Sequence, residues 1–160
     1  MRIGIATDHA GFGLKEELIT HLRENGHQVI DVGPYSLNAG DDYPDFVIPL
    51  AQAVVAGNVE RGVAVCGSGV GASVCANKIS GVRAGLVHDH FSARQGVEDD
   101  DMNIICMGGK VVGAAVARDL IDTFLASKFS GAERHLRRLR KVASLECHLP
   151  TNEMPQGDRT

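Results

Sequence analysis

The sequence feature that most constrains the fold is an apolar run that leads directly into a glycine-rich loop. The run is Gly62-Val63-Ala64-Val65, and the loop is Cys66-Gly67-Ser68-Gly69-Val70-Gly71. Small residues follow, so the pattern predicts a buried strand, a tight turn and a helix. In that arrangement the backbone N–H groups of the loop converge on a point where an anion can bind. Cys66 lies at the mouth of this cradle, where N–H dipoles favour a thiolate.

Apolar stretches and helical patterns alternate along the rest of the chain. The predicted strands are 2–7, 27–32, 62–65, 82–87 and 103–107, and helices are predicted between and after them, the last at 132–147. This alternation is typical of an α/β fold with right-handed crossovers. We predict a single-domain, doubly wound, Rossmann-like sheet of five parallel strands in the order 2-1-3-4-5, with helices on both faces and an extra C-terminal helix. The domain is expected to span 1–147, followed by a loosely ordered tail, 148–160.

The predicted strand order brings two strand ends together. Strands one and three are neighbours in that order, and open α/β sheets bind ligands at such a switch point, beyond the carboxyl ends of the strands. Asp8 and His9 follow the first strand, and Cys66 ends the third. We therefore expect these three side chains to share one crevice. The alternative interpretation of Asp8 and His9 is a helix N-cap followed by a surface histidine.

Composition and charge exclude several classes of protein. The formal net charge of −4 gives no reason to expect a nucleic acid partner. No apolar run is long enough to cross a membrane, and the sequence starts with a predicted strand rather than a signal peptide. The four cysteines form no C-x-x-C pair. These features predict a cytoplasmic protein with reduced thiols and without a membrane or nucleic acid partner.

The glycine-rich loop also fits a competing pattern. Gly67-x-Gly69-x-x-Ala72 matches the loose dinucleotide fingerprint, and Asp89 lies near the position of a ribose-binding acid. That fingerprint normally opens the first strand–helix–strand unit, whereas here it follows the third strand. A phosphatase loop is excluded, because the residue where it needs arginine is Ala72.

Two charged clusters have both a functional and a purely structural interpretation. The acidic run 98–101 is explained by a solvated loop, and its combination with His88 and His90 is weak support for a metal site. Arg134 and Arg138 are spaced to share one helix face. That face can clamp a phosphate with forked donors, or it can simply be a solvated surface.

Several segments in order resemble one known family. They are Asp8-His9-Ala10-Gly11, Asp42-Tyr43-Pro44, Cys66-Gly67-Ser68-Gly69-Val70-Gly71, Ala76-Asn77-Lys78 and Arg134-His135. They closely resemble the type B ribose-5-phosphate isomerases, a family that includes the galactose-6-phosphate isomerase subunits, and the resemblance covers residues 2–146. It implies isomerisation of a sugar phosphate, with ribose 5-phosphate and ribulose 5-phosphate as the expected pair, without a metal or other cofactor. It also implies a homodimer or homotetramer with sites shared between subunits.

The resemblance implies roles for the matching residues at the reacting end of the sugar. Cys66 takes the place of the base that removes the C2 proton, which returns at C1 through a cis-enediolate. Ser68 stands beside the reacting end, and Asp8 binds sugar hydroxyls or moves a proton between oxygens. The enediolate is stabilised by backbone N–H groups of the substrate-binding loop residues Gly67, Gly69, Val70 and Gly71. Tyr43 is also among the implied substrate-binding residues. The implied phosphate-binding residues are His9, Arg134 and Arg138, which resemble the phosphate-binding set of the family.

The chain departs from the family pattern at the substrate's entry and recognition end. The family usually has His-Asn-Asp-Thr-Asn before the last strand, and this chain has Asp99-Asp100-Asp101-Met102-Asn103. Asp99 thus replaces the histidine that opens the furanose ring, and Asp100 replaces an asparagine. A phosphate-binding arginine is Lys110 here, which keeps the charge but loses the bidentate fork.

These departures leave alternatives open. Asp99, His88 or His90 takes over ring opening, or the substrate is another sugar, such as a tetrose, allose or galactose phosphate or a free sugar. The alternative of a different class is a non-catalytic nucleotide-binding module of the same fold.

Overall fold

The computed structural model describes residues 1–146. The chain forms two compact units, Met1–Ser130 and a second that begins at Gly131. The first unit contains the strands β1 (Arg2–Thr7), β2 (Gln28–Asp31), β3 (Arg61–Cys66), β4 (Ala84–Leu86) and β5 (Ile104–Gly108). Its helices are α1 (Phe12–Glu24), α2 (Pro44–Val55), α3 (Val70–Ala76), α4 (His90–Asp100) and α5 (Ala114–Ala126), with a 3-10 turn at His9–Gly11. The second unit contains α6 (Glu133–Glu146), and the predicted tail, together with Cys147, lies outside the described residues.

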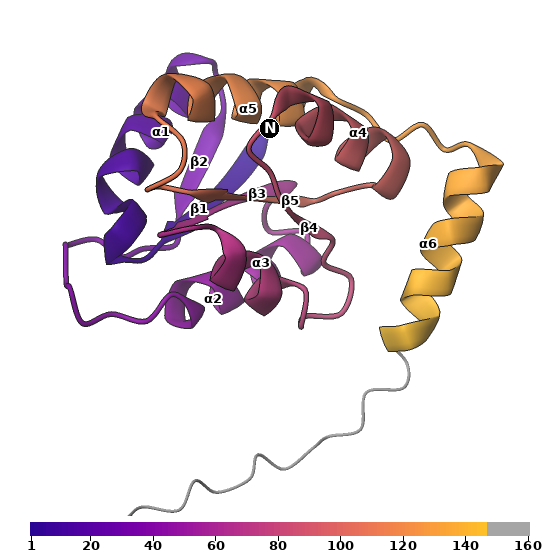
Figure 1. The fold of residues 1–160 in the computed structure, drawn as a ribbon, viewed down its shortest axis with the longest axis horizontal. Coiled ribbons are helices and arrows are strands. Elements are labelled where there is room, and N and C mark those ends of the chain that lie inside the picture. The colour runs from indigo at the N-terminus through magenta and orange to yellow at the C-terminus, as the bar shows by residue number, and fades with distance from the viewer. Residues whose placement is uncertain (147–160) are drawn as a thin grey trace, which may run out of the picture. The chain divides into compact units, whose positions relative to one another are not determined.

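The five strands form one parallel sheet in the order β2-β1-β3-β5-β4 (Figure 1). The predicted parallel α/β sheet is confirmed, but the predicted order 2-1-3-4-5 is wrong for its last two strands. The physical reason is burial. Every residue of β5 is buried, as expected for a strand with neighbours on both sides and helices on both faces. The three residues of β4 are partly or fully exposed, which suits the edge of the sheet.

The exchange of the last two strands also decides which face each helix covers. From β3 the chain passes beyond the position of β5 to reach β4 and then returns to β5. Right-handed crossovers therefore place α3 and α4 on opposite faces. In agreement, α1, α4 and α5 pack on one face of the sheet, and α2 and α3 pack on the other (Figure 1).

Side-chain alternation along β3 decides where Cys66 points. Val63 and Val65 join the hydrophobic cluster of α1, α4 and α5, whereas Ala64 and Cys66 join the cluster of α2 and α3. The Cys66 side chain therefore lies in the layer of α3, the helix that follows it. Within residues 1–146, none of the helices combines the length and the apolar character needed to cross a membrane.

Candidate active site

The carboxyl ends of β1, β3 and β5 meet at one edge of the sheet, and the loops after them interlock. Gly109 N donates to Cys66 O at 2.8 Å, and Lys110 N donates to Gly67 O at 3.0 Å. The loop after β1 packs against the same place, because a Cβ added at Gly109 would lie 3.1 Å from Ala10 O. These contacts hold the turn after β1 and the glycine-rich loop beside each other, as expected for a ligand site at the β1/β3 switch point.

Cys66 ends β3 at the centre of this edge. This residue is 5% exposed, and Gly69 N donates to its Sγ atom at 3.2 Å. Val70 N donates to Ser68 Oγ at 3.3 Å. The next N–H groups lie in the first turn of α3. N–H groups in the first turn of a helix have no carbonyl partner within the helix, so they are available to an anion. The thiol therefore lies beside N–H donors that stabilise negative charge both on sulfur and on a neighbouring oxyanion.

Two positions in this loop require glycine. Gly69 has φ +81°, and a Cβ there would lie 2.5 Å from Leu86 Cδ1 and 2.8 Å from the carbonyl carbon of Met107. Both the left-handed backbone and the close approach of β5 exclude a side chain. At Gly71 a Cβ would lie 2.9 Å from Tyr43 Cζ, so the Tyr43 ring rests against the first turn of α3.

Asp8 and His9 are fixed by different partners at the end of β1. Asp8 is 7% exposed, and its carboxylate accepts from Ala10 N at 3.0 Å, so it caps the 3-10 turn. His9 Nδ1 lies 2.8 Å from Asp41 Oδ1, an oxygen that also accepts from His9 N at 2.9 Å. The hydrogen bond to Asp41 is the largest cause that raises the pKa of His9 above its ordinary value of 6.5. The charges of Asp8 and Asp41 add to it, whereas burial acts in the opposite direction.

The end of β4 adds a further side chain to this edge. Gly108 N donates to His88 Nε2 at 3.1 Å, and a Cβ added at Gly108 would lie 2.8 Å from Ser68 O. His88 therefore lies at the carboxyl ends of the strands, bonded to the end of β5 where Ser68 also packs.

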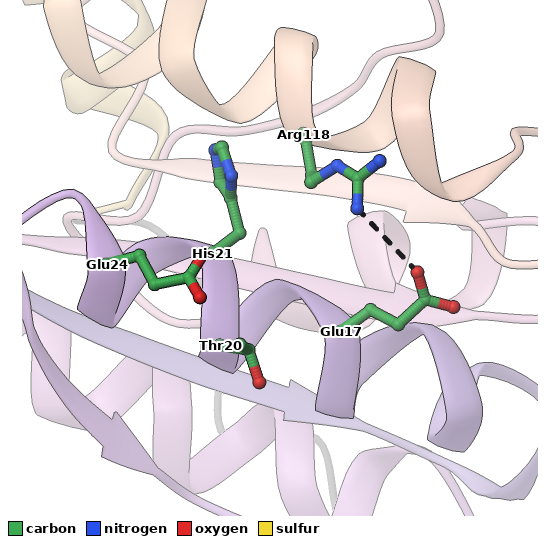
Figure 2. Close-up of a pocket in the computed structure, with 5 residues that line it drawn as sticks. All are labelled: Glu17, Thr20, His21, Glu24 and Arg118. Atoms are coloured by element: carbon green, nitrogen blue, oxygen red, sulfur yellow. Dashed lines mark ion pairs between the residues drawn. The ribbon is translucent and has the colours of Figure 1, made fainter.

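A pocket of about 350 Å³ lies elsewhere, between α1 and α5 (Figure 2). It is lined by Glu17, Thr20, His21, Glu24 and Arg118. Arg118 and Glu17 form a long ion pair at 3.9 Å across it, drawn as a dashed line in Figure 2. None of the predicted site residues lines this pocket. The carboxyl edge of the sheet, where thiol, carboxylate and N–H donors converge, has the chemistry that the pocket lacks.

Comparison with known proteins decides the family. A family model described as Ribose/Galactose Isomerase matches residues 3–142. The chain belongs to the ribose/galactose isomerase family. Ribose-5-phosphate isomerase B of Escherichia coli (strain K12) is 37% identical over 145 residues, which cover 91% of this chain and 96% of that protein.

Solved structures of the ribose/galactose isomerase family show the same fold. Ribose-5-phosphate isomerase B of Clostridium thermocellum matches with a TM-score of 0.89 and 41% identity, covering 92% of this chain and 98% of that one. The Mycoplasma genitalium enzyme, solved with bound ribulose-5-phosphate, matches with a TM-score of 0.87 and 36% identity, covering 92% and 97%.

Most of the predicted site residues of this ribose/galactose isomerase lie together at the carboxyl edge. They are Asp8, His9, Tyr43, Cys66, Gly67, Ser68, Gly69, Val70, Gly71 and Lys110, on the loops described above and on the first turn of α3. Their assigned roles remain predictions. Within residues 1–146, no three side chains of His, Cys, Asp or Glu gather in a way that could hold a metal ion.

Asp99 and Asp100 lie at the opposite end of the strands, near their amino ends. They end α4, directly before β5 begins, whereas Cys66 pairs with Gly108 at the far end of β5. Gln95 Nε2 donates to Asp99 Oδ2 at 2.8 Å. Within a single subunit, Asp99 and Cys66 therefore do not line the same crevice.

Arg134 and Arg138 belong to the second unit and are placed within that unit alone. Both are exposed on α6, one helical turn apart. Arg134 Nε donates to His135 Nε2 at 2.7 Å.

Sequence reasoning missed two charged residues that organise the site. Lys15 is completely buried, and its Nζ donates to both carboxylate oxygens of Asp31 at 2.9 Å and to Pro34 O at 2.6 Å. Its signal was its spacing, because Lys15 falls on the same buried helix stripe as Leu18 and Leu22. Asp41 had no such signal, because it lies in a polar loop without periodicity.

Proposed function

We propose that this chain is an aldose–ketose isomerase that interconverts ribose 5-phosphate and ribulose 5-phosphate. The observation behind the proposal is the Cys66 thiol, which accepts a hydrogen bond from Gly69 N inside a glycine cradle at the β1/β3 switch point. The names of the relatives support the same reaction, and so does the ribulose-5-phosphate bound to the Mycoplasma genitalium enzyme. We propose that this chain acts in the cytoplasm, in keeping with its free thiols at Cys66, Cys75 and Cys106.

The proposed reaction moves one proton between carbons and one between oxygens. The Cys66 thiolate removes the proton from C2 of the open-chain aldose, and the electron pair forms the C1–C2 double bond of a cis-enediolate. The N–H groups of Gly67 to Gly71 stabilise the charge on O1 and O2. Asp8 transfers the proton from O2 to O1, and Cys66 returns its proton to C1, which leaves the ketone at C2. Ser68 Oγ orients the reacting end.

A panel of sugars tests this function directly. Wild-type protein is expected to isomerise ribose 5-phosphate with a kcat/KM at least about 100-fold above that for free ribose, because binding energy from the phosphate lowers the barrier. The panel includes tetrose, allose and galactose phosphates and the free sugars, and ketose formation is followed in each case. Equal rates for phosphorylated and free sugars would refute a sugar-phosphate isomerase.

The panel also decides the second candidate, a sugar phosphate other than ribose 5-phosphate. Asp99 and Lys110 favour this candidate, because an acidic side chain and a point charge replace the ring-opening histidine and the forked arginine of the family pattern. A tetrose phosphate has no furanose ring to open and needs no such histidine. A higher kcat/KM for the tetrose phosphate than for ribose 5-phosphate would establish the second candidate.

The active assembly in this proposal is a homodimer or homotetramer with sites shared between subunits. Asp99 and Asp100 of one copy complete the cradle of Cys66 in another copy, and Arg134 and Arg138 are proposed as phosphate ligands. Support comes from the position of Asp99 at the opposite edge of its own sheet. The apolar residues Val70 and Leu86 beside the cradle, and Phe91 at the start of α4, are also 50%, 41% and 65% exposed and offer a surface for a second copy.

Subunit complementation tests the shared site. Cys66→Ala and Asp99→Asn are each expected to be nearly inactive alone. A mixed dimer of the two has one site with both native residues, so random reassembly of equal amounts is expected to restore about a quarter of the wild-type activity. The measurement is ribose 5-phosphate turnover before and after mixing. Full activity of Asp99→Asn alone would remove Asp99 from the mechanism, and no recovery on mixing would contradict the shared site.

A further inference from the structure

Asp41 reaches the site from the loop between β2 and α2 and contacts His9 twice. Its Oδ1 atom accepts from His9 N at 2.9 Å and lies 2.8 Å from His9 Nδ1. The Asp41 side chain is 7% exposed, whereas the His9 side chain is 37% exposed. A buried carboxylate therefore holds one edge of an imidazole ring that remains accessible to a ligand.

The bonding of Asp41 favours a positive charge on that ring. Asp41 Oδ2 is buried and, among the residues described, has no hydrogen-bond partner. A buried carboxylate is costly unless a cation pairs with it. The protonated ring of His9 is the cation that lies against it. If His9 were neutral, its ring would not balance the negative charge of the buried Asp41 carboxylate, and that burial would cost free energy.

Other titratable groups lie on the elements next to His9. Asp8, on the same turn, also favours the protonated ring through its charge. Cys66 ends β3 beside this turn, and Lys110 lies on the loop after β5, where its side chain is exposed and its charge is screened by solvent. The hydrogen bond to Asp41 is the largest of the causes that raise the pKa of His9.

We propose that Asp41 is a positioning residue for the substrate phosphate, which fixes the His9 ring through Nδ1 and keeps it positively charged so that Nε2 donates to a phosphate oxygen. The inference rests on the sugar-phosphate function proposed above. A neutral ring held at Nδ1 presents a lone pair at Nε2, which repels phosphate, whereas the cation presents an N–H. A charge-assisted hydrogen bond to phosphate is also the stronger kind.

The resulting pH dependence has a definite sign. His9 is charged below its pKa and loses the charge as the pH rises through that value, so phosphate affinity falls there. A phosphate monoester becomes a dianion above about pH 6. Binding is therefore best between about pH 6 and the pKa of His9. Removing the charge of Asp41 lowers that pKa and narrows this range from its alkaline end.

NMR titration of the His9 ring in the full chain is the first test, with His9→Asn to assign its signals. Asp41→Asn keeps an oxygen acceptor but removes the charge, and it is expected to lower the pKa of His9 by about one unit. The matched control is Asp42→Asn, which removes the same charge from the exposed neighbouring side chain and is expected to leave the titration unchanged. Identical titrations of wild type and Asp41→Asn, or equal shifts in both variants, would overturn the proposal.

The wild-type ring supplies a measurement that needs no variant. Because Asp41 accepts from Nδ1, the neutral ring at high pH is expected to keep its proton on Nδ1, which the ring nitrogen chemical shifts report. A neutral ring with its proton on Nε2 would overturn the proposal even if Asp41→Asn failed to fold.

Kinetics connect the ring to the substrate. KM for the phosphorylated sugar is expected to be the same in wild type and Asp41→Asn below both His9 pKa values, and up to about tenfold higher in the variant above both. A KM increase that is equal at every pH would indicate a merely structural role and overturn the proposal. If wild type isomerised no sugar phosphate, the proposed function would fail, whereas titration of His9 with and without inorganic phosphate would still decide the role of Asp41.

Discussion

Replacement of Cys66 by alanine is expected to lower kcat/KM for ribose 5-phosphate by about 10³-fold, within the range that a positioned general base contributes. The loss should fall mainly on kcat, because in the proposed mechanism the thiol acts on the C2 proton and other residues hold the phosphate. Exchange of the C2 proton with deuterated solvent should disappear together with turnover. Ketose formation and proton exchange are both measured by NMR on the same samples.

Cys75→Ala is the matched control for this experiment. Cys75 lies on α3, one residue before the helix ends, is only partly buried, and has a pKa that burial raises. It is therefore a poor thiolate, and its replacement is expected to leave kcat and KM near their wild-type values. Wild-type turnover in Cys66→Ala, or an equal loss in Cys75→Ala, would show that the Cys-base mechanism is wrong.

Replacement of Lys15 by methionine is expected to lower the free energy of unfolding by about 3 kcal/mol, as is typical when one partner of a buried ion pair is removed. The side chain of Lys15 is completely buried, and its Nζ satisfies both oxygens of Asp31 and the carbonyl of Pro34. Methionine fills the space but leaves these oxygens without their donor. Urea unfolding of both proteins measures the difference.

Two further variants distinguish the effect of losing the buried Lys15–Asp31 pair from the effect of losing any single charge. Glu16→Gln removes the exposed carboxylate that lies 3.6 Å from the same Nζ, and it is expected to change stability by less than about 0.5 kcal/mol. Lys15→Met with Asp31→Asn should recover part of the loss, because the uncompensated charge is gone. A Lys15→Met protein as stable as Glu16→Gln would contradict this account of the pair.

The Lys15 network also has a consequence for the site. Asp31 Oδ1 accepts from Gly33 N at 2.8 Å, so the pair ties the start of the loop before α2 to α1. The same loop supplies Asp41 to His9 and Tyr43 to the first turn of α3. Residual folded Lys15→Met protein should therefore show a raised KM for the sugar phosphate.

Much of the fold could be predicted from local patterns. The predicted strand 2–7 has the bounds of β1, and each other predicted strand ends within two residues of the observed one, because apolar runs between glycine turns are strong local signals. The cradle could be predicted for a similar reason. A strand, three glycines in five residues and small helix residues leave the backbone few alternatives, and Gly69 indeed has a positive φ.

The order of β4 and β5 could not be derived from the length and position of the strands alone. A signal was present, because Ile104-Ile105-Cys106-Met107 is a continuous apolar run and the segment before α4 contains Arg83. A continuous run indicates a central strand, and a shorter polar one an edge. The common order of doubly wound folds takes no account of this difference in polarity.

By itself, the sequence determined that this chain forms a parallel α/β sheet with Cys66 in a glycine-rich loop at the end of β3, because backbone conformation and hydrophobic periodicity are local properties. Only the tertiary structure decided which charged residues from distant segments lie together. The Lys15–Asp31 pair, the Asp41–His9 pair and the separation of Asp99 from Cys66 join or part residues that are 16, 32 and 33 positions apart in the chain. Such partners are set by how the loops and strands pack, and no pattern within one segment contains that information.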